Sequence, residues 1–170
     1  MPHASRVGLA EIGGPWRVSF PPALGGPSEA WFETLQSWSE NTDAGIRYFS
    51  GTASYATTFK VARSWLERPR LEIDLGAVKN VAEIRVNGQS AGITWKAPFR
   101  VDVTELVKPG VNALEVRVTD LWVNRLIGDQ QPGATPVAMT TFNPYRADSP
   151  LLPAGLLGPV MLLTRSSPHR

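Results

Sequence analysis

Side chains suited to binding a polyhydroxylated ligand gather in the stretch 120–157, which has little strand pattern. With one tryptophan from another expected loop, the candidate set is Trp95, Trp122, Asn124, Arg125, Asp129 and Tyr145. Aromatic rings stack on the C–H faces of sugars, while amide, carboxylate and guanidinium groups hydrogen-bond to hydroxyls. These six residues are therefore the sugar-binding candidates of the sequence.

A structural role would account for the same residues. Trp95 and Trp122 would then close the ends of the core, and Asn124, Arg125 and Asp129 would hydrogen-bond the long segment to itself. The four-residue spacing of Arg125 and Asp129 also suits an ion pair on a helical turn, worth about 0.2–0.5 kcal/mol. Both roles are open at the level of sequence.

Independent glycoside cleavage is not expected from this chain, because it needs two carboxylates about 5–5.5 Å or 6.5–9.5 Å apart across a cleft. Most of the fifteen acidic residues are expected on solvated faces. Those at outward positions of predicted strands are Glu72, Asp74, Glu83 and Glu115. Three acids of the long segment could converge instead: Asp120, Asp129 and Asp148.

The residue types that usually bind transition metals are scarce. Cysteine is absent, and the two histidines are His3 and His169, near opposite ends of the sequence. Disulfides, thiolate catalysis and multi-histidine metal sites are therefore not expected. A structural Ca²⁺ ion would need about six to eight oxygen ligands, and the sequence has no dense acidic loop. We expect no cofactor, with structural calcium as the alternative.

Length and composition favour one globular domain. The 170 residues are 42% hydrophobic and 19% charged, an ordinary balance for a chain with a core. Seventeen basic residues against fifteen acidic ones give a net charge of +2. This small excess is scattered, which argues against nucleic acid as a partner. No apolar run approaches the roughly 20 residues of a membrane span, and residues 1–20 lack the pattern of a secretion signal.

Short runs of alternating apolar and polar residues predict strands joined by turns. In Leu71-Glu72-Ile73-Asp74-Leu75 every second residue is apolar, so that one face would be buried and the other wet. Glycine and proline, fifteen of each, separate such runs. The predicted strands cover residues 16–20, 51–61, 70–75, 81–87, 99–103, 112–119 and 159–164.

Turn and helix signals complete the predicted organisation. Asn87-Gly88 predicts a tight hairpin, and Pro109-Gly110 predicts a turn before the strand that starts near residue 112. A short helix is expected at 29–35 and a single helical turn at 104–107. We divide the chain into a flexible N-terminal segment (1–13), one β-sandwich domain (14–165) and a C-terminal tail (166–170).

Several runs resemble the galactose-binding-like, sugar-binding domain of family 2 glycoside hydrolases. They include Val86-Asn87-Gly88-Gln89-Ser90-Ala91-Gly92, Lys108-Pro109-Gly110-Val111-Asn112 and Gly155-Leu156-Leu157-Gly158-Pro159-Val160. The last run departs from the family at Ala154, where serine is usual, and at Pro159. This resemblance implies an all-β fold, an antiparallel jelly-roll β-sandwich, and a setting in carbohydrate breakdown.

A fuller set of runs is similar to the C-terminal part of family 106 α-L-rhamnosidases. In chain order they are Gly14-Pro15-Trp16-Arg17-Val18, Ser37-Trp38-Ser39, Ile46-Arg47-Tyr48-Phe49-Ser50-Gly51, and Leu121-Trp122-Val123-Asn124-Arg125-Leu126. The resemblance covers roughly residues 14–164. It implies that the catalytic acids lie in a separate barrel domain, and it suggests a periplasmic or secreted protein.

The leading hypothesis is a non-catalytic accessory domain of a glycoside hydrolase. Its partners would be carbohydrate and the catalytic domain of the parent enzyme, with the long segment held at one rim of the sandwich, near the substrate cleft. Two alternatives are a free-standing carbohydrate-binding module and a protein-interaction sandwich with no sugar role.

Overall fold

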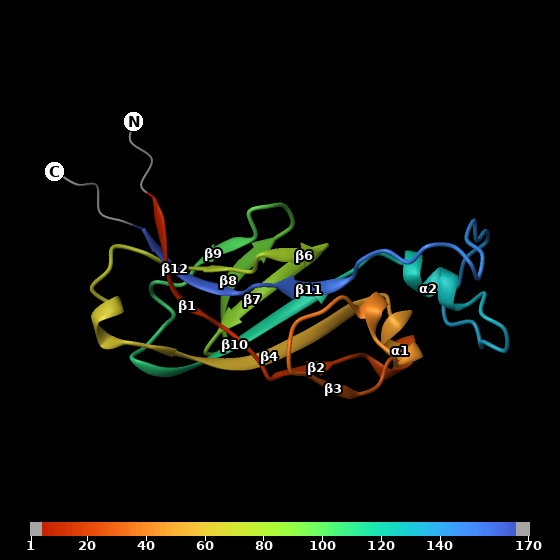
Figure 1. Ribbon diagram of the computed structural model, residues 1–170, viewed down its shortest axis with the longest axis horizontal. Helices are drawn as coiled ribbons and strands as arrows, with labels where there is room; N and C mark the ends of the chain where they lie inside the picture. Colours follow the sequence, from red (N-terminus) through yellow and green to blue (C-terminus); the bar gives the residue numbers. More distant parts are fainter. Residues whose placement is uncertain (1–4, 166–170) are drawn as a thin grey trace.

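The computed structural model describes residues 5–165, which form an antiparallel jelly-roll β-sandwich (Figure 1). The strands are β1 (Arg6–Glu11), β2 (Trp16–Ser19), β3 (Glu29–Phe32), β4 (Thr52–Val61), β5 (Leu71–Asp74), β6 (Ala77–Lys79), β7 (Val81–Val86), β8 (Gln89–Thr94), β9 (Arg100–Asp102), β10 (Gly110–Thr119), β11 (Gly155–Gly158) and β12 (Met161–Arg165). The α-helices are α1 (Ala44–Arg47) and α2 (Val123–Gly128), and short 3₁₀ turns are η1 (Pro22–Leu24), η2 (Trp38–Glu40) and η3 (Arg63–Trp65).

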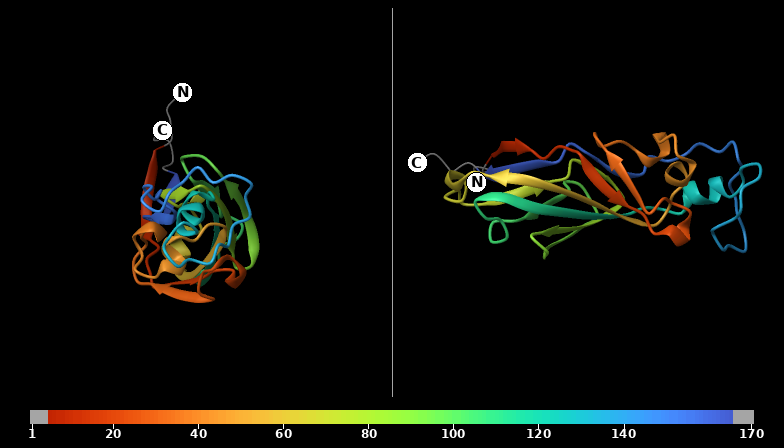
Figure 2. Two further views of the ribbon diagram at one scale, coloured as in Figure 1. Left: turned by 90° about the vertical axis from the view of Figure 1, so that its right-hand side faces the viewer. Right: turned by 90° about the horizontal axis from the view of Figure 1, so that it is seen from below.

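The strands form two main layers. One sheet has the order β3-β2-β4-β10-β7-β8 and the other β1-β12-β5-β9, while β11 and β6 form a small pair. Every pairing between these strands is antiparallel. The long strands β4 and β10 pair from Thr52–Thr119 to Val61–Gly110, so they form the spine of the molecule (Figures 1 and 2). The predicted all-β sandwich is confirmed.

The core contains an aromatic cluster near one end of the sandwich. Trp38 stacks on Tyr55 with ring centroids 6.4 Å apart, and Phe49 meets Trp38 edge to face at 5.3 Å. Trp38 Nε1 donates a hydrogen bond to Tyr55 Oη (2.6 Å), which also accepts one from the backbone N–H of Leu156 (3.1 Å). Burial raises the pKa of Tyr55 well above its ordinary value, so the phenol stays protonated.

The seven strands predicted from alternation each coincide with a strand of the structure. The hairpin at Asn87-Gly88 is also confirmed: these residues have φ of 51° and 80° and connect β7 to β8. Gly110 has φ of 87° at the Pro109-Gly110 turn. Residues 104–107 form the predicted single turn, in which the N–H groups of Leu106 and Val107 donate to the carbonyl of Val103. Short-range chemistry therefore dictates these features.

One assignment from the sequence was wrong. The helix expected at 29–35 is instead strand β3, because Glu29 and Trp31 face outward while Phe32 packs inward against β2. Within the segment expected to be flexible, residues 6–11 form β1, which pairs with β12. As an edge strand with mostly exposed side chains, β1 carries little alternation to predict it. Residues 1–4 and the expected tail at 166–170 lie outside the described residues.

Glu72 also departs from expectation, because it is only 4% exposed. Arg6 Nε donates to its carboxylate at 2.7 Å, and the guanidinium groups of Arg70 and Arg165 lie 3.4 Å away. Burial alone would raise the pKa of Glu72, but the three arginines lower it below its ordinary value. A side chain that points away from the core is therefore still buried when arginines from neighbouring segments cover it.

Candidate functional site

The segment between β10 and β11 forms an arm, defined here as residues 120–154. It contains helix α2 and extends beyond the strands at the end of the molecule opposite Arg6 and Arg165 (Figures 1 and 2). The predicted long segment therefore exists, although residues 155–157 belong to β11. It extends the sandwich at one end.

Buried polar side chains fix the base of the arm. Asn124, which is 1% exposed, donates to the carbonyl of Leu152 and accepts from its N–H, both at 2.8 Å. The N–H of Arg125 donates to Ser50 Oγ (3.1 Å) on the sandwich. Side-chain amides substitute here for the backbone partners that an irregular loop lacks. The base of the arm is thus anchored both to itself and to the domain.

Asp129 organises the outer part of the arm. Its carboxylate accepts from Arg125 Nε (2.8 Å) and from the N–H groups of Val137 (3.1 Å) and Ala138 (2.8 Å). The side chains of Arg125 and Asp129 are only 8% and 5% exposed. Further out, Asn143 Nδ2 donates to the carbonyl of Leu126 (2.9 Å). The arm is an ordered structure.

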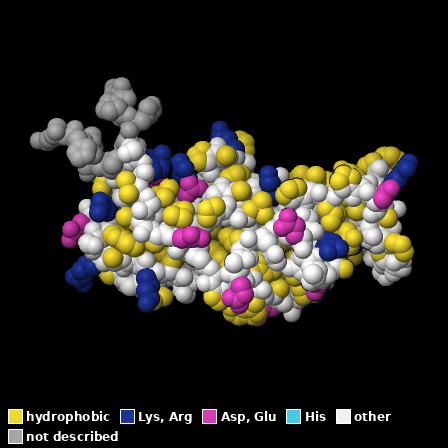
Figure 3. Space-filling model, in the orientation of Figure 1, with side chains coloured by type: hydrophobic (Ala, Val, Ile, Leu, Met, Phe, Trp, Pro, Cys, Tyr) yellow, Lys and Arg dark blue, Asp and Glu magenta, His cyan; other side chains and the backbone are white. Residues whose placement is uncertain are grey.

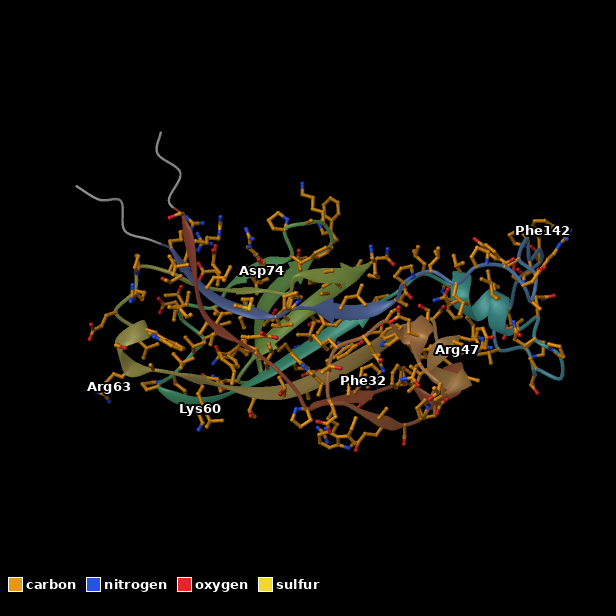
Figure 4. The ribbon with its side chains drawn as sticks, viewed as in Figure 1. Phe32, Arg47, Lys60, Arg63, Asp74 and Phe142 are labelled. Atoms are coloured by element: carbon orange, nitrogen blue, oxygen red, sulfur yellow. The ribbon has the colours of Figure 1, made fainter. Side chains whose placement is uncertain are left out.

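The outer surface of the arm exposes several large apolar side chains beside the charged residues Arg146 and Asp148. Its exposed large apolar side chains are Leu121, Trp122, Met139, Phe142 and Leu152. Phe142 lies at the tip (Figure 4), and hydrophobic side chains are visible along this end of the surface (Figure 3). A hollow of about 440 Å³ is lined by Trp122, Leu126, Ala138, Met139 and Thr140. Such a concentration of exposed apolar side chains is typical of a contact surface.

The six sugar-binding candidates do not form one site. Trp122 borders the arm's hollow, whereas Asn124, Arg125 and Asp129 are engaged in the bonds described above. Tyr145 lies half-buried in the arm. Trp95 is 67% exposed in the connection from β8 to β9, away from the arm, with Lys96 Nζ 5.3 Å from its ring centroid. Neither Trp95 nor Trp122, which is 46% exposed, closes an end of the core.

A larger hollow lies on the outer face of the six-stranded sheet, and sequence reasoning missed it. Its volume is about 770 Å³, and its lining includes Trp31, Arg17, Ser54, Arg85 and Glu115. Trp31 is 60% exposed on edge strand β3, whereas Trp16 and Trp38 are buried in the core. The signal in the sequence is that Trp31 shares its alternation phase with Glu29. We call this hollow the sheet groove.

The acids of the arm show no catalytic arrangement in the described residues. Both carboxylate oxygens of Asp129 already accept hydrogen bonds within the arm, and Asp148 is exposed to solvent. Burial raises the pKa of Asp120 to about 6, and its carboxylate accepts from the N–H of Leu121 (2.7 Å). Between residues 5 and 165, no three His, Cys, Asp or Glu side chains are grouped to hold a metal ion. The helices of this part are too short or too polar to cross a membrane.

The sequence profile described as glycosyl hydrolases family 2, sugar binding domain, matches residues 38–165. The chain belongs to this family. The match begins at Trp38 of the aromatic cluster and ends at the last residue of β12, so this sugar-binding domain comprises most of the sandwich and the whole arm. The predicted resemblance to family 2 is confirmed.

Similar proteins are much longer than this sugar-binding domain. It is 42% identical over 176 residues to a putative beta-glucuronidase of Formosa agariphila, covering 89% of this chain and 15% of that protein. It matches a rhamnosidase from Novosphingobium sp. PP1Y with a TM-score of 0.90 and 40% identity, covering 96% of this chain and 16% of the other. The predicted likeness to a rhamnosidase is thus confirmed.

A more distant structural neighbour is an uncultured Clostridium sp. beta-glucuronidase. Its TM-score is 0.68 at 23% identity, covering 97% of this chain and 30% of that one. At this identity the likeness shows the fold alone.

Proposed function

We propose that this family 2 sugar-binding domain is a non-catalytic accessory domain of a larger glycoside hydrolase, and that its arm docks on the catalytic domain of that enzyme. The observation that carries the proposal is an ordered arm that exposes large apolar side chains on its outer surface. Met139 is fully exposed and Phe142 is 75% exposed, although the backbone beneath them is fixed by Asp129 and Asn143.

An ordered arm with exposed apolar side chains gains stability when a partner covers it. Fully burying one large apolar side chain contributes about 1.5–3 kcal/mol, and the arm is already ordered, so little entropy would be lost on docking. The partner is inferred from chain length: the domain spans 15–16% of its two most informative relatives. Those relatives are a putative beta-glucuronidase and a rhamnosidase, so the neighbour we propose is the catalytic domain of a glycosidase.

The acids of the chain support a non-catalytic role. Asp129 serves the fold of the arm, and Glu72 is covered by three arginines. A glycosidase needs two carboxylates that face one substrate. In this proposal both catalytic carboxylates are supplied by the parent enzyme, and the arm lies near the cleft in which carbohydrate is bound.

The proposal is tested in the full-length gene product with the double variant Met139→Asp/Phe142→Asp. A charge placed in an apolar interface is costly, so glycosidase activity after mild heating should fall at least about tenfold. The matched control is Ile93→Asp, which alters a side chain that is 65% exposed on β8, and it should leave activity within about twofold. Equal behaviour of the two variants would refute docking through the arm.

A second measurement tests the non-catalytic role. The 170-residue chain should not hydrolyse aryl rhamnosides or aryl glucuronides. Turnover by this chain that is abolished by Asp129→Asn, while the variant remains folded, would overturn the proposal.

A further inference from the structure

We propose that the sheet groove is a second binding surface, separate from the arm, and that it binds a neutral oligosaccharide. The groove lies on the outer face of the sheet β3-β2-β4-β10-β7-β8. The six candidates from the sequence do not line it. The inference therefore concerns different residues from the proposed function and does not depend on docking of the arm.

Strand register places the groove's side chains in two rows across the sheet. The first row crosses five strands and consists of Trp31, Arg17, Ala56, Glu115 and Arg85. The second row runs beside it and consists of Glu29, Ser19, Ser54, Arg117 and Glu83. Its two serines line the groove, and its three charged residues lie at the border. Because residues at alternate positions share a face, both rows point away from the core.

The shape of the groove follows from residue size. Small residues at its centre, Ala56 and Ala113, lie between longer side chains on either side, Arg17 and Arg85. Gly14 and Gly88 also line the groove. The resulting volume of about 770 Å³ lies in the upper part of the range of roughly 300–1,000 Å³ found for ligand clefts. An extended ligand of several rings fits this shape better than a single small molecule.

The chemistry of the groove combines one aromatic face with many hydrogen-bonding groups. Trp31 is 60% exposed at the edge strand and offers a ring for stacking on C–H groups. Ser54 Oγ donates to Glu115 Oε1 at 2.8 Å, which holds that carboxylate over the centre of the sheet. Arginine and glutamate side chains then supply donors and acceptors for hydroxyls.

Charge balance favours a neutral ligand over an anionic one. The two rows hold three arginines and three glutamates. Glu83 pairs with two of the arginines and Glu29 with the third, while Glu115 accepts from Ser54. Arg117 Nη1 lies 3.2 Å and Arg85 Nε 3.4 Å from Glu83, and Arg17 Nη1 lies 3.7 Å from Glu29. Pairing of this kind leaves no excess positive charge to attract phosphate or uronate groups. Besides Trp31, the lining combines small apolar residues such as Ala56 and Ala113 with hydroxyl and charged side chains, whereas charged residues are depleted at the centre of a protein interface.

The test is titration of the 170-residue chain with neutral and anionic probes, followed by calorimetry and tryptophan fluorescence. The neutral probes are cellohexaose, xylohexaose and laminarihexaose, and the anionic probe is a polygalacturonate oligomer. We expect at least one neutral probe to bind, with Trp31→Ala weakening it about tenfold or more. Glu115→Gln should weaken it as well, and both variants should keep the wild-type melting temperature because these side chains are outside the core.

Two matched control variants show whether binding depends on the tryptophan of the groove. Trp95→Ala and Trp122→Ala remove exposed indoles that lie outside the groove and should leave binding unchanged. Binding that is lost in Trp122→Ala but kept in Trp31→Ala would overturn the proposal, as would tighter binding of the anionic probe. Failure of all neutral probes to bind at millimolar concentration would also overturn it. If Trp31→Ala instead destabilises only the full-length protein, the groove is an interface between domains and the inference is wrong.

Discussion

Asp129→Asn isolates the interaction on which the order of the arm depends. The substitution keeps the size of the side chain but removes the negative charge beside Arg125, whose side chain is 8% exposed. One amide oxygen cannot replace two carboxylate oxygens that accept from Arg125, Val137 and Ala138. If the oxygen faces the two backbone N–H groups, the amide NH₂ faces the guanidinium and two donors are opposed.

The expected magnitude follows from burial. Removing one partner of a buried ion pair costs about 3–5 kcal/mol, because the remaining charge has no partner. A solvated pair at the same helical spacing would contribute only about 0.2–0.5 kcal/mol. The bonds of Asp129 lie within the arm, so we expect the cost to appear mainly as local opening of the arm, and the sandwich should remain folded.

Hydrogen exchange measures this directly. In Asp129→Asn the amides of Val137 and Ala138 should exchange about 10²–10⁴-fold faster than in the wild type, while amides of β4 and β10 change little. The matched control is Asp148→Asn, on the exposed part of the same arm, which should leave all these rates unchanged. Wild-type exchange at Val137 and Ala138 in the Asp129 variant would refute the argument that this carboxylate orders the arm.

Three further substitutions test the sandwich by urea denaturation. Asp120 has a pKa of about 6 in the folded state, against 3.8 for an unperturbed carboxyl group. The folded state therefore binds a proton more tightly than the unfolded state, and the free energy of unfolding should fall as pH rises from 4 to 6. Asp120→Asn should remove this fall, which is worth about 1–2 kcal/mol after allowance for partial solvation. Tyr55→Phe leaves the buried N–H groups of Trp38 and Leu156 without an acceptor and should cost about 2–4 kcal/mol at any pH between 5 and 8; a loss under 1 kcal/mol would contradict this role. Glu72 has a lowered pKa, so its contribution to the stability of the fold is present above about pH 4.5 and is lost as pH falls further. Glu72→Gln should cost about 1.5–3 kcal/mol of stability at pH 7 and progressively less in acid. A loss that does not depend on pH would argue against the role of the three arginines.

Much of the sandwich could be predicted because its strands obey local rules. Leu71–Asp74 shows its buried face by alternation, and Asn87-Gly88 has the backbone freedom that a hairpin requires. The edge strands β1 and β3 could not be predicted from these rules. Strand β3 was predicted as a helix because four residues, one of them an exposed tryptophan, do not define a period. Whether such a segment forms a strand depends on its pairing partner, and the residues that pair between β2 and β3 are 10 to 16 positions apart in the sequence.

The candidate site could be predicted only in its residue types. The spacing of Arg125 and Asp129 indicated an ion pair, and that pair exists. The sequence could not indicate that the same carboxylate accepts from Val137 and Ala138, because those bonds depend on the path of an irregular loop. The sheet groove was hidden for a related reason: Trp31 and Glu115 are distant in sequence, and strand register places them in one row.

The antiparallel pairing of β1 with β12 sets how the domain responds to tension. Arg6 lies opposite Arg165 at one end of this pair. A force that pulls these two residues apart acts across the strands, so it loads their hydrogen bonds one after another. The pair should therefore unzip at low force, whereas β4 and β10, held in the middle of the other sheet, would carry little load until β1 had peeled away. In a mechanical experiment this edge would be the weak point of the molecule.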